Sequence, residues 1–142
     1  MSAIDAAVVD AKLRELAHRL RRVAAKKPAS ARALARNEDL QDIVARNLSL
    51  AIQACIDIAF HLCAAHGVVP ATSGEAFTQL AGKGLIARGL AQRMQRAVGF
   101  RNVLVHEYTE VDWKIVMRVV GIGTRDLAAF GKAVVAILER GD

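Results

Sequence analysis

The sequence contains few aromatic, proline and cysteine residues. Of 142 residues, four are Phe, one is Trp, one is Tyr, two are Pro and two are Cys, whereas 54% are apolar, many of them alanine. A chain of this length can bury a single core without disulfides or metals to support it. The scarcity of aromatic residues and the abundance of alanine favour close-packed helices over a β-sandwich. We therefore predict one all-α domain that spans residues 1–142.

The two cysteines are not placed to form a disulfide. Cys55 and Cys63 lie eight residues apart in what the sequence predicts to be one helix. At a rise of 1.5 Å per residue their Cα atoms would be about 12 Å apart, which is too far for a disulfide. We expect two buried thiols.

A secretion signal and a clear membrane span are also missing from the pattern. The N-terminal residues alternate charged and apolar side chains instead of forming a basic end followed by an apolar core and a cleavage site. The longest apolar region, residues 48–65, is interrupted by Gln53, Asp57 and His61, which argues against a transmembrane helix. The expectation is a cytoplasmic protein with no membrane partner.

Two classes of enzyme site are absent from the sequence. It has no glycine-rich phosphate loop of the kind found in ATPases, and no cluster of carboxylates of the kind that holds the metals of a nuclease. We therefore expect neither a metal nor another cofactor.

The positive charge is concentrated in two parts of the chain. Residues 1–36 carry nine Lys or Arg and three Asp or Glu, whereas the remaining residues carry eleven of each. A second basic run without acidic residues consists of Lys83, Arg88, Arg93, Arg96 and Arg101. Such patches attract phosphate backbones or acidic proteins, although basic residues on a helix commonly form only its solvated face.

Apolar residues recur at spacings of three and four, which is the period of an amphipathic helix. The first such helix ends at Lys26-Lys27-Pro28, since proline disfavours a helical residue before it. A long second helix should start between residues 30 and 39 and run to His66, with Gly67 as its stop.

The second half of the chain predicts three further helices. They cover residues 73–81, the region from Leu85 into the segment around residue 100, and a final stretch that starts near Asp112. Gly121 and Gly123 mark a bend or a close approach in the last of these. The pattern as a whole predicts an antiparallel bundle of four to five helices.

Four polar residues form a stripe along the long second helix. Ser49, Gln53, Asp57 and His61 follow one another at intervals of four. The stripe is either a solvent-facing edge or a polar wall of a cleft, in which Asp57 and His61 would be the chemically active residues. These two could also ligate a metal, but two ligands without a third are weak support for a metal site.

The segment Gly-Phe-Arg-Asn-Val-Leu-Val-His-Glu-Tyr, residues 99–108, gathers polar residues in an apolar setting. On an ideal helix Phe100, Val103 and Leu104 would face the core, while Arg101 would share another face with Val105 and Tyr108. His106 would lie about 140° from Arg101 around the axis. One straight helix cannot aim both side chains at one small target, so the helix is distorted or ends here, or a second subunit completes the pair.

Arginine and histidine together suffice for RNA cleavage without a metal. Histidine can accept a proton from a ribose 2′-hydroxyl or give one to a leaving oxygen, and arginine stabilises the charge on the phosphorane. Here the pair extends to Arg-Asn-x3-His-x-Tyr and follows a basic helix. Endonucleolytic and exonucleolytic cleavage both remain open.

These residues resemble the Arg-x4-His-x-Tyr signature of HepT-like toxins, a branch of the HEPN superfamily of helical ribonucleases. The similarity extends over nearly the whole chain, through residues 46–67, residues 69–86 and residues 126–138. The family often has a glutamate before the arginine of its second helix, whereas this chain has Ala45 before Arg46.

The resemblance implies a HEPN-like homodimer in which the two signatures meet in a cleft between subunits. It also implies an MntA-like nucleotidyltransferase antitoxin as partner, which attaches AMP to the signature tyrosine. On this basis Arg101 and His106 are the catalytic pair, Asn102 is a supporting residue and Tyr108 is the AMPylation site. The alternative is a non-catalytic helical module that binds a nucleotidyltransferase, a nucleotide or RNA.

Overall fold

The computed structural model describes residues 3–106 and 111–141, and within these ranges all regular structure is helical. The helices are α1 (Ala6–Ala25), α2 (Ala31–Ala35), α3 (Glu38–Ala65), α4 (Ser73–Gly82), α5 (Arg88–His106), α6 (Trp113–Arg118) and α7 (Thr124–Arg140). A π-helical turn, η2 (Val119–Gly123), joins α6 to α7 without a break. Counted as one helix, α6–η2–α7 gives five longer helices and the one-turn α2, so the predicted all-α class is confirmed and α2 is the helix that the sequence pattern missed.

The helix ends follow the local signals in the sequence. Side-chain oxygens of Asp5, Asn37 and Thr72 accept hydrogen bonds from backbone N–H groups in the first turns of α1, α3 and α4, which satisfies donors that have no partner within the helix. Gly67 and Gly84 follow α3 and α4 with positive φ angles of 72° and 73°, a conformation that glycine adopts without steric cost.

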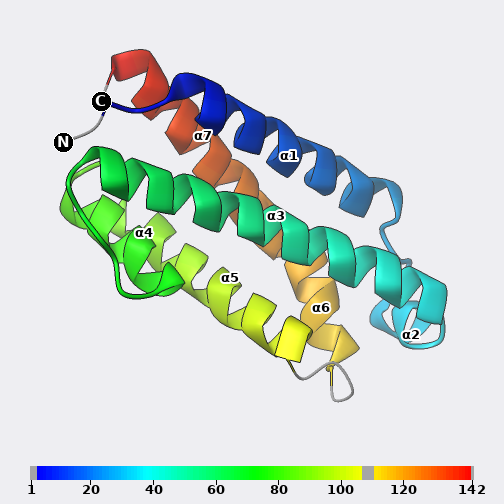
Figure 1. Ribbon diagram of the computed structural model, residues 1–142. Coiled ribbons are helices and arrows are strands. Elements are labelled where there is room, and N and C mark those ends of the chain that lie inside the picture. The colour runs from blue at the N-terminus through cyan, green and yellow to red at the C-terminus, as the bar shows by residue number, and fades with distance from the viewer. Residues whose placement is uncertain (1–2, 107–110, 142) are drawn as a thin grey trace.

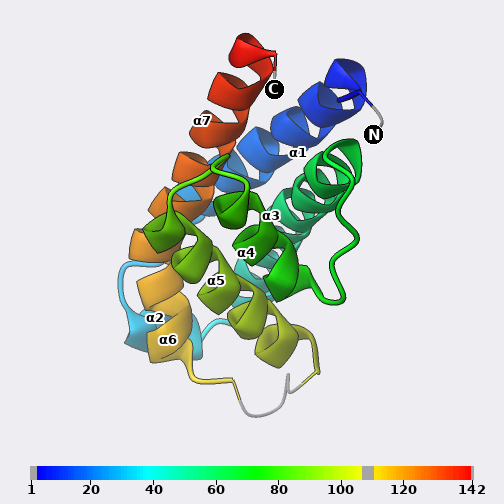
Figure 2. The ribbon, with the colours of Figure 1, turned by 90° about the vertical axis from the view of Figure 1, so that its left-hand side faces the viewer.

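The helix α3 lies at the centre of an antiparallel bundle. Figure 1 shows α1 running beside α3 in the opposite direction, α5 on the other side of α3, and α7 behind them. Figure 2, turned by 90°, shows α4 and α5 together on one side of the bundle and α1 and α7 on the other. Because α3 contacts α1, α2, α4, α5 and α7, one chain covers most of its apolar sides. The apolar character of α3 therefore does not require a second subunit.

The central helix is long and apolar enough to cross a membrane by length and composition alone. In the structure, however, 61% of its most apolar window is buried inside the bundle, as expected of a core helix. Cys55 and Cys63 are both buried and both free, which confirms the expectation of two thiols.

The bundle contains two hydrophobic clusters. The larger one fills the space between α1, α3, α4, α5 and α7, and includes an edge-to-face contact between Phe77 and Phe130 with ring centroids 5.2 Å apart. The smaller one lies where α2, the start of α3, the end of α5 and α6 meet, and Leu104 is part of it. This second cluster fixes the position of the final turns of α5.

Gly123 is required by the π-helical turn. A Cβ atom at this position would lie 2.7 Å from Cγ1 of Val119, closer than non-bonded carbon atoms approach. Gly121, by contrast, has nothing within 4 Å of its notional Cβ. The close approach predicted for the two glycines is therefore confirmed at Gly123.

Candidate functional site

Arg101 and His106 both lie in the last turns of α5, which stays regular up to His106. Arg101 is partly buried, and its Nε atom is fully buried with no hydrogen-bond partner among the described residues. His106 is exposed at the C-terminal end of the helix. Of the alternatives that the sequence left open, a distortion does not occur within α5, whereas the described helix does end at His106. On this regular helix the two side chains point about 140° apart around the axis.

Leu104, Val103 and Val105 show how the C-terminal end of α5 is packed. Leu104 is 3% exposed and belongs to the smaller hydrophobic cluster, as predicted, and Phe100 is half-buried against both clusters. The prediction that Val103 faces the core is wrong, because Val103 is 47% exposed. Val105 is exposed to the same extent. At the end of α5, the aliphatic side chains of Val103 and Val105 are thus exposed to solvent on either side of Asn102 and His106.

Asn102 and Tyr108 complete the sequence motif. Asn102 is exposed on α5, within one turn of His106. Tyr108 lies outside the described residues.

A shallow depression of about 320 Å³ lies beside the motif, between α3 and the end of α5. Leu104 lines it from α5, and Arg46 and Ser49 line it from α3 together with Asp42 and Ala45. Arg46 is exposed and Ala45 is buried. In the sequence, Arg46 was noted only because Ala45 precedes it in place of a glutamate. The position of Arg46 beside Leu104 depends on the packing of α3 against α5.

Asp57 and His61 lie in the seam between α1 and α3. Lys12 Nζ is 2.9 Å from Asp57 Oδ2, and Gln53 Nε2 donates to Asp57 Oδ1 at 2.7 Å. The backbone N–H of Asp5 donates to His61 Nε2 at 3.0 Å. Both side chains therefore have partners that tie α1 to α3. Within residues 3–106 and 111–141, no group of three or more His, Cys, Asp or Glu side chains is placed to hold a metal.

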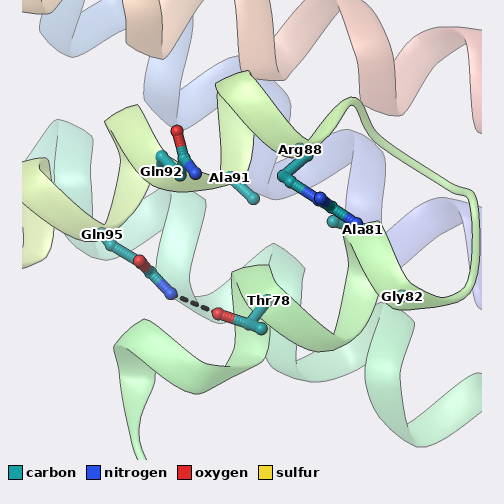
Figure 3. Close-up of a pocket in the computed structure, with 7 residues that line it drawn as sticks. All are labelled: Thr78, Ala81, Gly82, Arg88, Ala91, Gln92 and Gln95. Atoms are coloured by element: carbon teal, nitrogen blue, oxygen red, sulfur yellow. Dashed lines mark hydrogen bonds between the residues drawn. The ribbon is translucent and has the colours of Figure 1, made fainter.

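A separate pocket of about 320 Å³ lies between α4 and the first half of α5 (Figure 3). Arg88, Gln92 and Gln95 line it from α5, and Gln95 Nε2 donates to Thr78 Oγ1 of α4 and to the carbonyl oxygen of Gly74. These bonds connect α4 to α5, and the pocket lies at the opposite end of α5 from the motif.

The electrostatic setting of the motif is basic. Arg46 lies on the neighbouring helix, and Arg96 and Arg93 precede Arg101 on α5, where Arg93 is paired with Asp126 of α7 at 2.9 Å. The arrangement can attract a phosphate backbone to this end of the bundle.

Comparison with known proteins identifies the family. Residues 12–134 match the family model described as ribonuclease HepT-like. The mRNA nuclease HepT of Shewanella oneidensis is 39% identical over 92 residues, which are 64% of this chain and 69% of that protein.

Solved structures agree with the sequence comparison. A tri-AMPylated HEPN toxin of Shewanella oneidensis, solved in complex with its MNT antitoxin, superposes with a TM-score of 0.84 at 30% identity and covers 91% of this chain and 97% of the other. A toxin–antitoxin solved with AMP-PNP gives a TM-score of 0.85 at 29% identity, with coverages of 91% and 98%. The cytosolic protein YutE of Bacillus subtilis, of unknown function, shares only the fold, with a TM-score of 0.83 at 17% identity and coverages of 99% and 94%. With its helical bundle and the matched span of residues 12–134, this chain belongs to the ribonuclease HepT-like family.

Proposed function

We propose that this chain is a cytosolic ribonuclease toxin that cleaves RNA without a metal and is neutralised by a nucleotidyltransferase antitoxin. The observation that carries the proposal is the complete Arg-Asn-x3-His-x-Tyr signature at the end of α5, in a chain of the HepT-like family. A module that only docks a partner has no physical need for a proton-transfer group beside a phosphate-binding one.

The proposed reaction uses the substrate's own nucleophile. The ribose 2′-oxygen attacks the adjacent phosphorus, the bond from phosphorus to the 5′-oxygen breaks, and the products are a 2′,3′-cyclic phosphate and a 5′-hydroxyl. Two proton transfers are needed, one from the 2′-hydroxyl and one to the departing 5′-oxygen, and His106 supplies this chemistry. Arg101 stabilises the extra negative charge on the phosphorane.

A homodimer would bring together an arginine and a histidine that a single chain does not direct at one target. Arg101 is turned partly into the bundle and His106 is exposed on the same straight helix, so two copies of the motif that face each other would place an arginine from one chain near a histidine from the other. The two His106 side chains of such a dimer could serve as base and acid for the two proton transfers. Exposed Val103 and Val105 provide apolar area for the contact.

The buried Nε of Arg101 also supports this arrangement. A guanidinium donor with no partner among the described residues carries a desolvation cost, and that cost would be removed if the side chain turned outward so that a phosphate oxygen or a group from the second subunit accepted its hydrogen bond. Asn102, which shares a turn with His106, is proposed to orient the histidine or the substrate.

The antitoxin is proposed to act on Tyr108. The related toxin of Shewanella oneidensis is tri-AMPylated in its complex with an MNT antitoxin, and Tyr108 is the only tyrosine of this chain. An AMP group two residues after His106 would bring a phosphate and its negative charge close to Arg101. It would then occupy the space that the RNA requires and repel the incoming backbone.

The test is cleavage of single-stranded RNA and of the matching DNA in the presence of EDTA, beginning with mRNA because the relative is named an mRNA nuclease. RNA should be cut to products with 2′,3′-cyclic phosphate ends, and DNA should be spared because it has no 2′-hydroxyl. Arg101→Ala and His106→Ala should each abolish cleavage while the circular dichroism spectrum stays that of the wild type. If His106→Ala cuts as fast as the wild type, the mechanism is wrong, and if the wild type binds RNA without cutting it, the non-catalytic alternative holds.

A further inference from the structure

A second groove lies between α5 and the continuous helix α6–η2–α7. Its volume is about 280 Å³, and its lining is mostly apolar. Phe100 and the buried Leu127 contribute to its interior, while Ile115 and Ile122, which are 46% and 60% exposed, form the wall on the α6–η2 side.

Three arginines surround this apolar interior. Arg93 and Arg96 come from α5, and Arg118 comes from the end of α6. Arg93 is neutralised across the groove by Asp126, whose Oδ1 is 2.9 Å from its Nε. Arg96 and Arg118 are exposed, and neither forms a salt bridge with a described acidic residue. The groove therefore combines an apolar trough with two positive charges that no described acidic residue pairs with.

The wall of the groove contains the one irregular part of the described helices. Val119, Ile122 and Gly123 of the π-helical turn all line it, and π-helical turns within α-helices are found frequently at functional sites. Ile122 of this turn is exposed beside the groove. Gly123 has no side chain, and a Cβ atom at its position would lie too close to Val119.

We propose that this groove binds one nucleotide of single-stranded RNA, next to the phosphate that is cleaved; the inference rests on the proposed ribonuclease function. A nucleotide unit pairs a flat apolar base with an anionic phosphate, which matches an apolar trough with arginines at its rim. Proteins bind single-stranded RNA through basic grooves in which bases stack on aromatic rings or on arginine planes. The volume is close to the lower limit of about 300 Å³ for ligand pockets, which suits a single base with its sugar.

The position of Phe100 connects the groove to the motif. Phe100 lines the groove and directly precedes Arg101, so their Cα atoms are about 3.8 Å apart. Because consecutive helical side chains point about 100° apart around the axis, a strand that places a base against Phe100 would have to curve around α5 for Arg101 to hold the neighbouring phosphate. The sequence pattern does not reveal the groove, because its α5 residues and its α6–η2–α7 residues are at least 15 positions apart along the chain.

The binding test uses the His106→Ala protein, so that RNA is bound but not cut. Fluorescence anisotropy with a labelled ten-nucleotide single-stranded RNA gives the Kd. Replacing Arg96 and Arg118 together by Gln should raise the Kd about tenfold or more and lower the slope of log Kd against log salt by about 1.4, since each phosphate contact on a single strand contributes about 0.7. The matched control replaces Arg125 and Lys132 by Gln; both are exposed on α7 and do not line the groove. This control should change the Kd less than about twofold.

A second pair of variants adds charge instead of removing it. Ile122→Glu places a carboxylate on the wall and should weaken RNA binding by about tenfold, because the carboxylate repels the phosphate and lies beside Arg118. Val135→Glu makes the same change at an exposed valine of α7 outside the groove and should leave the Kd unchanged within about twofold. Both positions are exposed, so circular dichroism should show an intact bundle for both.

Equal effects of the groove and control variants would overturn the inference. So would a loss of dimer mass on light scattering for Ile122→Glu alone, since that result would mean that a second copy of the chain covers the groove. The proposed function fails separately: if the wild type does not cut RNA but binding still depends on Arg96 and Arg118, the groove stands without it. If the wild type cuts RNA and the groove variants bind it normally, the function stands without the groove.

Discussion

Arg101 and His106 lie on one unbroken helix with the arginine turned partly into the bundle and the histidine exposed to solvent. Five residues of α-helix separate their directions by about 140° around the axis. This relationship means that one chain does not direct both side chains of the proposed catalytic pair at one target. The proposed dimer is therefore needed for the reaction itself.

The first prediction concerns mixed dimers. Arg101→Ala and His106→Ala proteins should each be inactive, but a mixture that has exchanged subunits should regain part of the RNase activity, because the mixed dimer still contains one Arg101 and one His106 in the common cleft. The rate of RNA cleavage by a mixture refolded from denaturant measures this. Activity that stays absent, although mass spectrometry shows mixed dimers, would mean either that both residues of each working pair lie in the same chain or that both His106 side chains of the dimer are needed.

The second prediction concerns the surface that is proposed to hold two copies of the chain together. Val103→Glu should shift the protein towards monomer at micromolar concentration, because a carboxylate buried in an apolar contact loses its hydration. Light scattering measures the mass. The control is Val8→Glu, at a valine of α1 that is 44% exposed, which should leave the dimer intact. A wild-type protein that is already monomeric would contradict both this prediction and the proposed cleft.

The third prediction concerns the control of the toxin at Tyr108. Tyr108→Phe should keep RNase activity, since neither proposed catalytic step uses the hydroxyl group, but it should escape neutralisation by the nucleotidyltransferase with ATP. Intact-mass spectrometry after co-expression should show additions of AMP mass on the wild type and none on Tyr108→Phe. Equal modification of the two proteins would move the switch to another residue.

The fourth prediction concerns the π-helical turn. Gly123→Ala should lower the free energy of unfolding by about 1–3 kcal/mol, which is typical of an overpacked site, because the new Cβ would lie 2.7 Å from Cγ1 of Val119. Gly121→Ala, two residues earlier with open space around its Cβ, should be neutral or stabilising by up to about 1 kcal/mol. Urea unfolding followed by circular dichroism compares them, and an equal loss in both variants would show that the contact with Val119 relaxes without cost.

The fifth prediction concerns the two thiols. Burial raises the pKa of the Cys55 thiol far above its ordinary value, and burial followed by the charge of Glu75 raises the pKa of the Cys63 thiol. Because the thiolate is the nucleophile and a raised pKa leaves less of it, neither cysteine of the native protein should react with iodoacetamide at pH 8. Both should react in urea. Rapid labelling of Cys63 in the native protein would show that this part of α3 opens to solvent.

The local part of this fold follows from the sequence alone. Pro28 sets the end of the first helix, Gly67 ends the central one, and Asp112 caps α6 with its side chain, because these signals act between residues that are close along the chain. The motif at residues 101–108 and the burial of Cys55 and Cys63 could be recognised in the same way. The helical period also predicted correctly that Leu104 is buried.

The tertiary structure decided which helix face meets which neighbour. Val103 lies on a face that the helical period assigned to the core but that no described helix covers. Asp57 pairs with Lys12 of α1, and His61 accepts a hydrogen bond from Asp5 just before α1, in both cases more than 40 residues away. Arg96 and Arg118 line one groove only because the continuous helix α6–η2–α7 packs against α5 through α7. Periodicity tells which residues share a face, but the burial and partners of that face depend on contacts between segments distant in sequence, and in this protein those contacts bury the Nε atom of Arg101 while His106 stays exposed.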